Sequence, residues 1–228
     1  MRILSFFLFT FLIFSTACSQ TGSSNATKAL KQSAAVPVNQ KDLSKLTKDY
    51  FAAGCFWCLE GVFESVKGVE EVVSGYSGGN TKNPTYEEVG SKTTGHAESV
   101  EVYYDSSKVD YMTLLKVYFN SMDPTQVNGQ GPDHGTPYRS IIFYRNAEQK
   151  ATAESLINAL NKSGKYDAPI SVEVKKFEKF WDAEDYHQNY IYHHPENPYV
   201  QHESIPRIQR FQKQFPELIK SDKNLAKQ

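Results

Sequence analysis

The spacing of apolar residues along the chain alternates between the period of a strand and that of a helix. Tyr50 to Ala53 form a short apolar run, and Val100, Val102 and Tyr104 alternate with their neighbours. Both patterns predict strands with at least one buried face. The same kind of alternation predicts two further strands, within residues 139–145 and 170–174.

Other apolar residues recur at the spacing of about 3.6 that marks one face of a helix. This spacing predicts helices through two sets of residues, Phe56, Leu59, Phe63 and Val66, and Tyr111, Leu114, Leu115 and Tyr118. Asn146, with Gln149 three residues later, resembles a capping box and predicts a helix that Gly164 can end. Strands and helices mixed in this order predict an α/β sandwich whose sheet is covered by helices.

Residues 120–137 follow neither period and contain three glycines and three prolines. Long connections without regular structure are uncommon inside a domain and are usually functional. We therefore expect this segment to form part of an active-site wall.

The amino terminus has the pattern of an export signal. Arg2 precedes an apolar run that ends at Phe14 and is too short to span a bilayer. The residues up to Cys18 resemble a bacterial lipoprotein cleavage box, which implies that Cys18 becomes the lipidated first residue of the mature chain. An ordinary cleaved signal with an incidental cysteine stays open as the alternative.

Composition divides the rest of the chain. Residues 19–49 contain no aromatic side chain and are too polar to build a core. We therefore expect a signal peptide at 1–17, a lipidated cysteine and flexible linker at 18–48, one catalytic domain at 49–200, and a helix with a tail at 201–228. In that last segment Ile208, Phe211 and Phe215 lie at helical spacing. A net charge of -1 excludes general attraction to nucleic acid, so we expect a local site for its partners.

The candidate chemistry centres on a cysteine pair where a strand gives way to a helix. Cys55 should meet the positive end of that helix, which favours an ionised, nucleophilic thiolate. Cys58 lies one helical turn further on and can reach Cys55 to close a disulfide. Because the chain has three cysteines, lipidation of Cys18 would leave these two as a self-contained pair.

Several alternatives compete at this pair. A structural disulfide over so short a loop would stabilise little, and a zinc site would need ligands that lack the usual spacing, namely His187, His193, His194 and His202. We expect neither a metal nor a cofactor. A Cys-x-x-Cys pair alone would also suit an envelope thiol-disulfide oxidoreductase of another class, and a non-enzymatic lipoprotein is a further rival. Phe56 and Trp57 could hold a thioether methyl group, or could be ordinary core.

Six motifs in order along the chain together resemble one family. They are Gly54-Cys55-Phe56-Trp57, Asn83-Pro84-Thr85-Tyr86, Gly95-His96-Ala97-Glu98, Gln130-Gly131-Pro132-Asp133-His134-Gly135, Pro137-Tyr138-Arg139-Ser140 and Ala183-Glu184-Asp185-Tyr186-His187-Gln188. They look like the peptide methionine sulfoxide reductases of the A class, and the match runs from about Tyr50 to about Tyr199. The resemblance implies a two-layer sandwich with a ferredoxin-like core. It also implies reduction of methionine S-sulfoxide, free or in proteins.

Roles for individual residues follow from this resemblance and from the chemistry. A sulfoxide oxygen must be protonated as its bond breaks, and Glu98 lies on the predicted buried face of its strand, where burial would keep it protonated. Tyr86 and Tyr138 match phenols that hydrogen-bond the sulfoxide oxygen. Asp133 would orient the substrate, although an Asx turn explains it equally well. Phe56, Trp57 and Tyr190 would surround the methyl group.

The implied cycle has three steps. Cys55 takes the oxygen and becomes a sulfenic acid, Cys58 condenses with it to a disulfide, and a thioredoxin-like partner reduces that disulfide. Cys58 is the only internal candidate for the second step, since no cysteine follows it. We expect a monomer that faces the extracytoplasmic side of the cell envelope, held to the membrane by lipid at Cys18.

Overall fold

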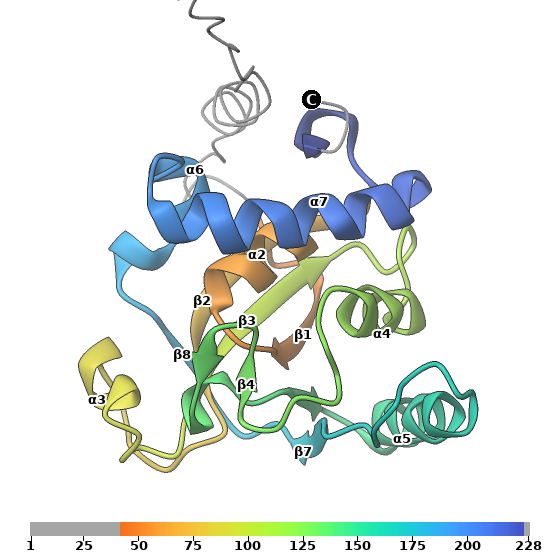
Figure 1. The fold of residues 1–228 in the computed structure, drawn as a ribbon, viewed down its shortest axis with the longest axis horizontal. Coiled ribbons are helices and arrows are strands. Elements are labelled where there is room, and N and C mark those ends of the chain that lie inside the picture. Colours follow the sequence, from red (N-terminus) through yellow and green to blue (C-terminus); the bar gives the residue numbers. More distant parts are fainter. Residues whose placement is uncertain (1–41, 226–228) are drawn as a thin grey trace, which may run out of the picture.

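A six-stranded mixed sheet forms the centre of the computed structural model, which describes residues 42–225 (Figure 1). The strands lie in the order β7-β6-β1-β3-β2-β8, and every neighbouring pair is antiparallel except β6 and β7. Their bounds are β1 Thr47–Ala52, β2 Val69–Ser77, β3 Ala97–Tyr104, β6 Ile141–Tyr144, β7 Glu173–Lys176 and β8 Phe180–Asp182. A separate two-stranded hairpin joins β4, Gly129–Gln130, to β5, Asp133–His134.

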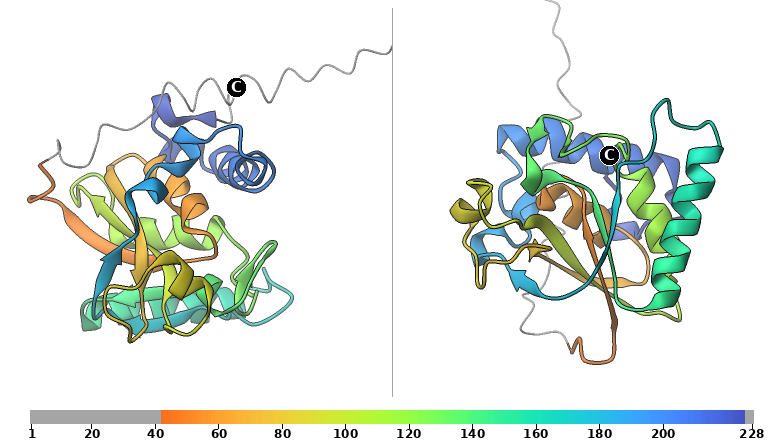
Figure 2. Two further views of the ribbon diagram at one scale, coloured as in Figure 1. Left: turned by 90° about the vertical axis from the view of Figure 1, so that its left-hand side faces the viewer. Right: turned by 90° about the horizontal axis from the view of Figure 1, so that it is seen from below.

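Helices cover the sheet. They are α2 Phe56–Glu64, α3 Tyr86–Gly90, α4 Tyr111–Asn120, α5 Ala147–Lys162, α6 Tyr190–His193 and α7 Ile205–Gln214. Helix α2 lies between the sheet and α7, which crosses above it in Figure 1. Helix α5 packs beside α4 at the edge formed by β6 and β7 (Figure 2).

The central strands have ferredoxin-like connections. Two β-α-β units, β1-α2-β2 and β3-α4-β6, interleave to give the strand order β6-β1-β3-β2. Each helix returns the chain to a strand that is parallel to the one before it, with an antiparallel strand in between. The predicted fold class, a sandwich with a mixed sheet and a ferredoxin-like core, is confirmed. The pairing order, which the sequence pattern did not provide, places β1 and β3 next to each other at the centre.

The predicted strands and helices agree with the structure except at some boundaries. Strand β1 begins at Thr47, two residues before the predicted start of the domain at 49. The strand predicted within residues 170–174 is displaced, because β7 covers only Glu173–Lys176. Strand β2 was not predicted, because nearly all of it is buried and it therefore has no alternation of apolar and polar residues.

The start of α5 shows how one cap also anchors a helix to the sheet. Asn146 Oδ1 accepts a hydrogen bond from Gln149 N (2.9 Å), and Gln149 Oε1 accepts from Arg145 N (2.8 Å). Gln149 Nε2 also donates to the buried Asp49 in β1 (2.6 Å), which accepts a second hydrogen bond from the Tyr104 hydroxyl (2.6 Å). The predicted cap is therefore present, but its return bond reaches Arg145 instead of Asn146.

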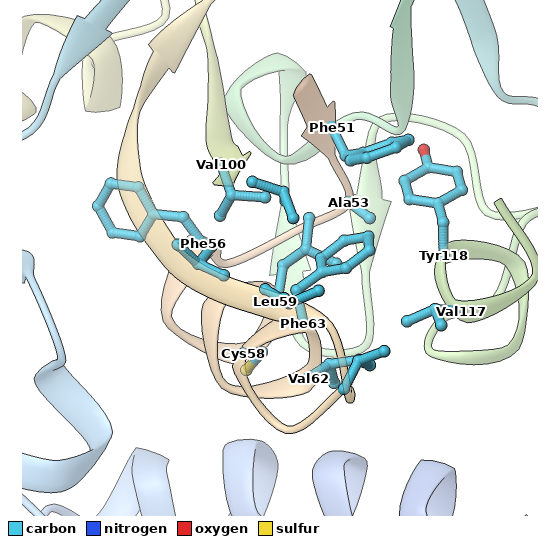
Figure 3. Packing of buried hydrophobic residues seen from close by; sticks show 14 of the residues in the cluster. Phe51, Ala53, Phe56, Cys58, Leu59, Val62, Phe63, Val100, Val117 and Tyr118 are labelled. Carbon is cyan, nitrogen blue, oxygen red and sulfur yellow. The ribbon is translucent and has the colours of Figure 1, made fainter. Parts of the chain in front are cut away.

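The main core lies between the sheet and α2. Phe51 from β1 stacks on Phe63 from α2 (ring centroids 5.0 Å apart), and Leu59 is fully buried beside them. Figure 3 shows these residues on one side of α2, with Cys58 on another side of the helix. Cys58 Sγ lies 3.2 Å from Ser204 Oγ, so this side of α2 faces the carboxyl-terminal segment.

The carboxyl-terminal helix is part of the folded unit. Ile208 and Phe211 are buried in α7, and Phe215 packs against the same core just after the helix ends. The predicted signal peptide, Cys18 and most of the linker lie outside the described residues. Within 42–225, none of the helices has the length and apolar character needed to cross a bilayer.

Replacing Phe211 by Ala tests whether α7 belongs to the core. We expect the free energy of unfolding to fall by about 3–5 kcal/mol, because a fully buried ring leaves a cavity. Urea unfolding followed by circular dichroism measures this change. Lys213→Ala, at an exposed position of the same helix, is the control and should stay within about 0.5 kcal/mol of wild type. Equal stabilities of the two variants would show that α7 contributes little.

Candidate active site

The turn from β1 to α2 places Cys55 at the start of a helix. Gly54 has φ +72°, and a Cβ atom there would lie 2.5 Å from the Cβ atom of Gln130, so the turn needs glycine. Gly54 N donates to Tyr138 O (3.1 Å), which ties the turn to the far wall of the site. Arg207 from α7 donates to Ala53 O through both terminal nitrogens (3.2 and 3.1 Å). Cys55 is therefore the N-cap residue of α2, as predicted.

Glu98 lies against the same helix start. Its side chain is 3% exposed, and Oε2 accepts a hydrogen bond from Phe56 N (3.1 Å). Burial raises the pKa of this carboxyl to about 8. The hydrogen bond from Phe56 N lowers the pKa, but by less than burial raises it. The carboxylate of Asp133 acts in the same direction as burial. Glu98 thus keeps its proton near neutral pH, in the environment that the strand alternation predicted.

The thiols of Cys55 and Cys58 form a hydrogen bond with each other, so the ionisation of one depends on that of the other. Burial raises the pKa of Cys55 well above its ordinary value, and its hydrogen bond to Cys58 and nearby acidic groups add to this. The same hydrogen bond lowers the pKa of Cys58 to about 7, against burial, and the guanidinium of Arg207 adds to the lowering. Burial and the second thiol therefore oppose the ionised Cys55 that the helix start alone predicts. Loss of a proton from the pair is favoured at Cys58 over Cys55.

A pocket of about 300 Å³ opens beside Cys55. It brings together most of the predicted residues, and its lining is Cys55, Phe56, Trp57, Tyr86, Glu98, Asp133, Tyr138, Asn197 and Tyr199. Burial raises the pKa of Tyr86 to about 12, and it also raises the pKa of Tyr138. Both phenols therefore remain donors throughout the physiological range. The pocket combines a thiol, a neutral carboxylic acid and three phenols with the aromatic faces of Phe56 and Trp57.

Asp133 projects from the hairpin within residues 120–137, so this segment does form a wall of the pocket. Asp133 Oδ2 accepts a hydrogen bond of 2.5 Å from the Tyr199 hydroxyl. Burial raises the pKa of Asp133, while the Tyr199 bond and the charge of Arg207 lower it. The alternative for Asp133 was an Asx turn. Within residues 42–225 the Asp133 side chain forms no hydrogen bond of that kind.

Tyr190 is not among the residues that line this pocket, and its contact with the substrate stays a prediction. Its ring lies flat against Trp57, with centroids 3.7 Å apart and planes at 5°. Trp57 Nε1 donates to Nδ1 of His187 (3.2 Å), and burial lowers the His187 pKa, so this histidine is a neutral acceptor. Tyr190 and His187 therefore fix the orientation of Trp57 from behind. Tyr186, the tyrosine of the sixth motif, is 55% exposed.

The sequence motifs did not identify two lining residues, Asn197 and Tyr199. A signal was present in the sequence. Asn197-Pro198 directly precedes Tyr199, much as Asn83-Pro84 precedes Tyr86 with one residue in between. Glu184 supports Tyr86 from outside the pocket by accepting from Tyr86 N (2.9 Å). Within residues 42–225, no three side chains among His, Cys, Asp and Glu are grouped as metal ligands would be.

Comparison with known proteins defines the class of this site. A family model described as Peptide methionine sulfoxide reductase matches residues 47–219. The chain is 48% identical to a peptide methionine sulfoxide reductase MsrA from Haloquadratum walsbyi, over 73% of this chain and 94% of the relative. An MsrA from Saccharolobus solfataricus is 47% identical over 73% of this chain and 93% of its own length.

Solved structures agree with the sequence comparison. Methionine sulfoxide reductase A of Corynebacterium diphtheriae is 31% identical, with a TM-score of 0.62 over 70% of this chain and 79% of that one. Mxr1 from Saccharomyces cerevisiae in its reduced form is 27% identical, with a TM-score of 0.64 over 69% of this chain and 91% of that one. The family match and these relatives identify the chain as an oxidoreductase acting on sulfur groups. The chain belongs to the peptide methionine sulfoxide reductase family, in its A class.

The protonation state of Glu98 can be measured directly. In protein labelled with ¹³C at the glutamate carboxyl, the signal lost in Glu98→Gln should titrate with a midpoint of about 8. In Asp133→Asn the midpoint should fall, because the Asp133 carboxylate raises the Glu98 pKa. Asp105→Asn, at an exposed turn, is the control and should leave the midpoint unchanged. A midpoint near the ordinary value of 4.5 would contradict the burial argument.

Proposed function

We propose that this chain reduces methionine S-sulfoxide, free or in proteins, with Cys55 as nucleophile and Glu98 as proton donor. The observation that carries the proposal is the common pocket of these two groups with Tyr86 and Tyr138. The family match supports the same reaction over a thiol-disulfide oxidoreductase of another class.

The hydrogen bond between the thiols supports a route to the reactive Cys55 thiolate. The Cys55 proton passes to the Cys58 sulfur, which is the more acidic partner in the free site and serves as the base. Cys55 then attacks the sulfoxide sulfur while Glu98 gives its proton to the sulfoxide oxygen. The bond between the substrate sulfur and its oxygen then breaks, and hydroxide leaves. Its attack on the Cys55 sulfur breaks the sulfur–sulfur bond just formed, so Cys55 becomes a sulfenic acid and methionine is released. The substrate sulfur is reduced, and the Cys55 sulfur is oxidised, by two electrons. Water restores the Glu98 proton.

The lining of the pocket supports recognition of a methyl sulfoxide. The rings of Phe56 and Trp57 offer apolar faces to the methyl group. The hydroxyls of Tyr86 and Tyr138 are the donors for the sulfoxide oxygen, which carries partial negative charge. Asp133 lies at the pocket wall, where its carboxylate can accept from the backbone amide of a peptide substrate.

Cys58 completes the cycle. Its thiol condenses with the sulfenic acid of Cys55, forming the disulfide and releasing water. Both cysteines are free in the structure, one turn of α2 apart, and Cys58 is 2% exposed. A thioredoxin-like partner then supplies two electrons by thiol-disulfide exchange.

We also propose that the protein works in the cell envelope, as a lipoprotein whose signal peptide is removed before Cys18. The apolar run after Arg2 and the small residues before Cys18 support this. The polar residues between Cys18 and β1 would let the enzyme reach oxidised proteins on the extracytoplasmic side.

Single-turnover assays test the roles of the cysteines and of Glu98. Without reductant, wild type should release one methionine per chain and lose both free thiols. Cys58→Ser should still release one methionine, more slowly because the base is gone, and Cys55→Ser none. Glu98→Gln should react at least 100-fold more slowly, as expected for loss of a general acid. Glu88→Gln, on the exposed side of α3, is the matched control. Wild-type rates in Cys55→Ser or Glu98→Gln would refute the assigned roles.

Mass spectrometry of protein isolated from its native membranes tests the lipid proposal. The mature chain should begin at Cys18 and carry acyl mass on that residue. Cys18→Ala should abolish both the added mass and membrane retention. A mature terminus elsewhere, without lipid, would support the ordinary secreted alternative.

A further inference from the structure

A second pocket of about 560 Å³ adjoins the substrate pocket on the other side of the cysteine pair. Cys58 lines this second pocket, whereas Cys55 and Glu98 line the first. Asp133 and Tyr199 line both pockets. Their 2.5 Å hydrogen bond therefore lies in the partition between the two spaces. Cys55 and Cys58 therefore face two different pockets.

The second pocket contains side chains of both charges. Lys165, Arg207 and Arg210 supply positive charge, and the acidic lining residues are Asp123, Asp133, Asp167 and Glu203. Arg210 is exposed and forms no ion pair within residues 42–225, and neither does Glu203. These two side chains are therefore available to a ligand that carries both charges.

Arg207 gives the inner end of the pocket a fixed positive charge. It is 9% exposed, and its guanidinium donates to backbone carbonyls only, to Ser121 O (2.6 Å) and to Ala53 O. No carboxylate among the described residues pairs with it within salt-bridge distance. Its charge is left to act on Cys58 and on any thiolate that approaches that sulfur.

We propose that this second pocket binds a low-molecular-weight thiol of amino-acid type, which reduces the Cys55–Cys58 disulfide by attacking Cys58. The proposal rests on the disulfide of the proposed function and adds a second electron donor to the cycle. Carboxylate and ammonium groups of the thiol would pair with Arg210 and Glu203. The volume suits a cysteine-sized or short-peptide thiol. Such a molecule would approach Cys58 through the pocket that this residue lines.

The exchange balances in two steps. The thiolate forms a bond to the Cys58 sulfur as the disulfide bond breaks, and Cys55 leaves with the electron pair and takes up a proton. A second thiolate then attacks the sulfur of the bound thiol, which releases Cys58. Two small thiols are oxidised to their disulfide, and the cysteine pair is reduced by two electrons. The substrate pocket stays free throughout.

The test measures the second-order rate at which small thiols reduce the oxidised full-length protein. The disulfide is prepared in two ways, with stoichiometric methionine sulfoxide and with diamide. The probes are cysteine, N-acetylcysteine, which lacks the ammonium group, and cysteine methyl ester, which lacks the carboxylate. Each rate is divided by the rate of the same thiol with a small aromatic disulfide, so that intrinsic nucleophilicity cancels. Arg210→Gln and Glu203→Gln are compared with Lys213→Gln, an exposed change on the same helix outside the pocket.

Cysteine should be the fastest probe with wild type. Arg210→Gln should slow cysteine and N-acetylcysteine by about threefold, the size of one solvent-exposed ion pair, and leave the methyl ester unchanged. Glu203→Gln should slow cysteine and the methyl ester similarly but not N-acetylcysteine. Lys213→Gln should match wild type, and methionine release should be equal in all. If the normalised reduction rates were equal for the three probes and for all variants, the proposal that this pocket binds a small thiol would be wrong. This holds whichever oxidant formed the disulfide. A disulfide formed by diamide alone would instead contradict the proposed function.

Discussion

The turn between β1 and α2 is the constraint on which the rest of the site depends. Gly54 can adopt its backbone conformation only because it lacks a side chain, and neighbouring elements hold the turn from three sides. Tyr138 accepts from Gly54 N, the Glu98 carboxyl accepts from Phe56 N, and Arg207 donates to Ala53 O. Nucleophile, acid and phenol are therefore positioned by the same few backbone atoms. A ferredoxin-like core makes this possible because β1, which leads into the turn that holds the thiol, and β3, which carries the acid, are adjacent at the centre of the sheet.

Burial then assigns a charge state to each group. In a space that excludes water the neutral forms are favoured, so Glu98 and Cys55 both retain protons near neutral pH. The exception is Cys58, whose pKa is lowered first by its hydrogen bond with Cys55 and further by the positive charge of Arg207. Glu98 holds a proton beside Cys55, and Cys55 can pass its own proton to Cys58. This arrangement suits a reaction in which an oxygen atom leaves sulfur. The carboxyl-terminal helix thus contributes electrostatically to a pair of residues located about 150 positions earlier.

The sequence predicted what depends on local periodicity and on motifs. Alternation through Val100 and Val102 identified the β3 strand and the buried side of Glu98, and the helical spacing from Phe56 identified α2. It missed β2, whose burial on both faces removes alternation, and Tyr199, which reaches the pocket only through tertiary packing. The ionised state assigned to Cys55 followed from helix geometry alone. That reasoning omitted desolvation and the second thiol, which both raise the pKa of Cys55.

The pH dependence of methionine release in a single turnover tests the central claim most directly, namely that a protonated Glu98 acts together with an ionised cysteine pair. The rate should rise through about pH 7 as the pair loses its proton and fall through about pH 8 as Glu98 loses its own. In Glu98→Gln the falling limb should disappear while the rising limb remains. A falling limb at the same pH in that variant, or none in wild type, would contradict the account.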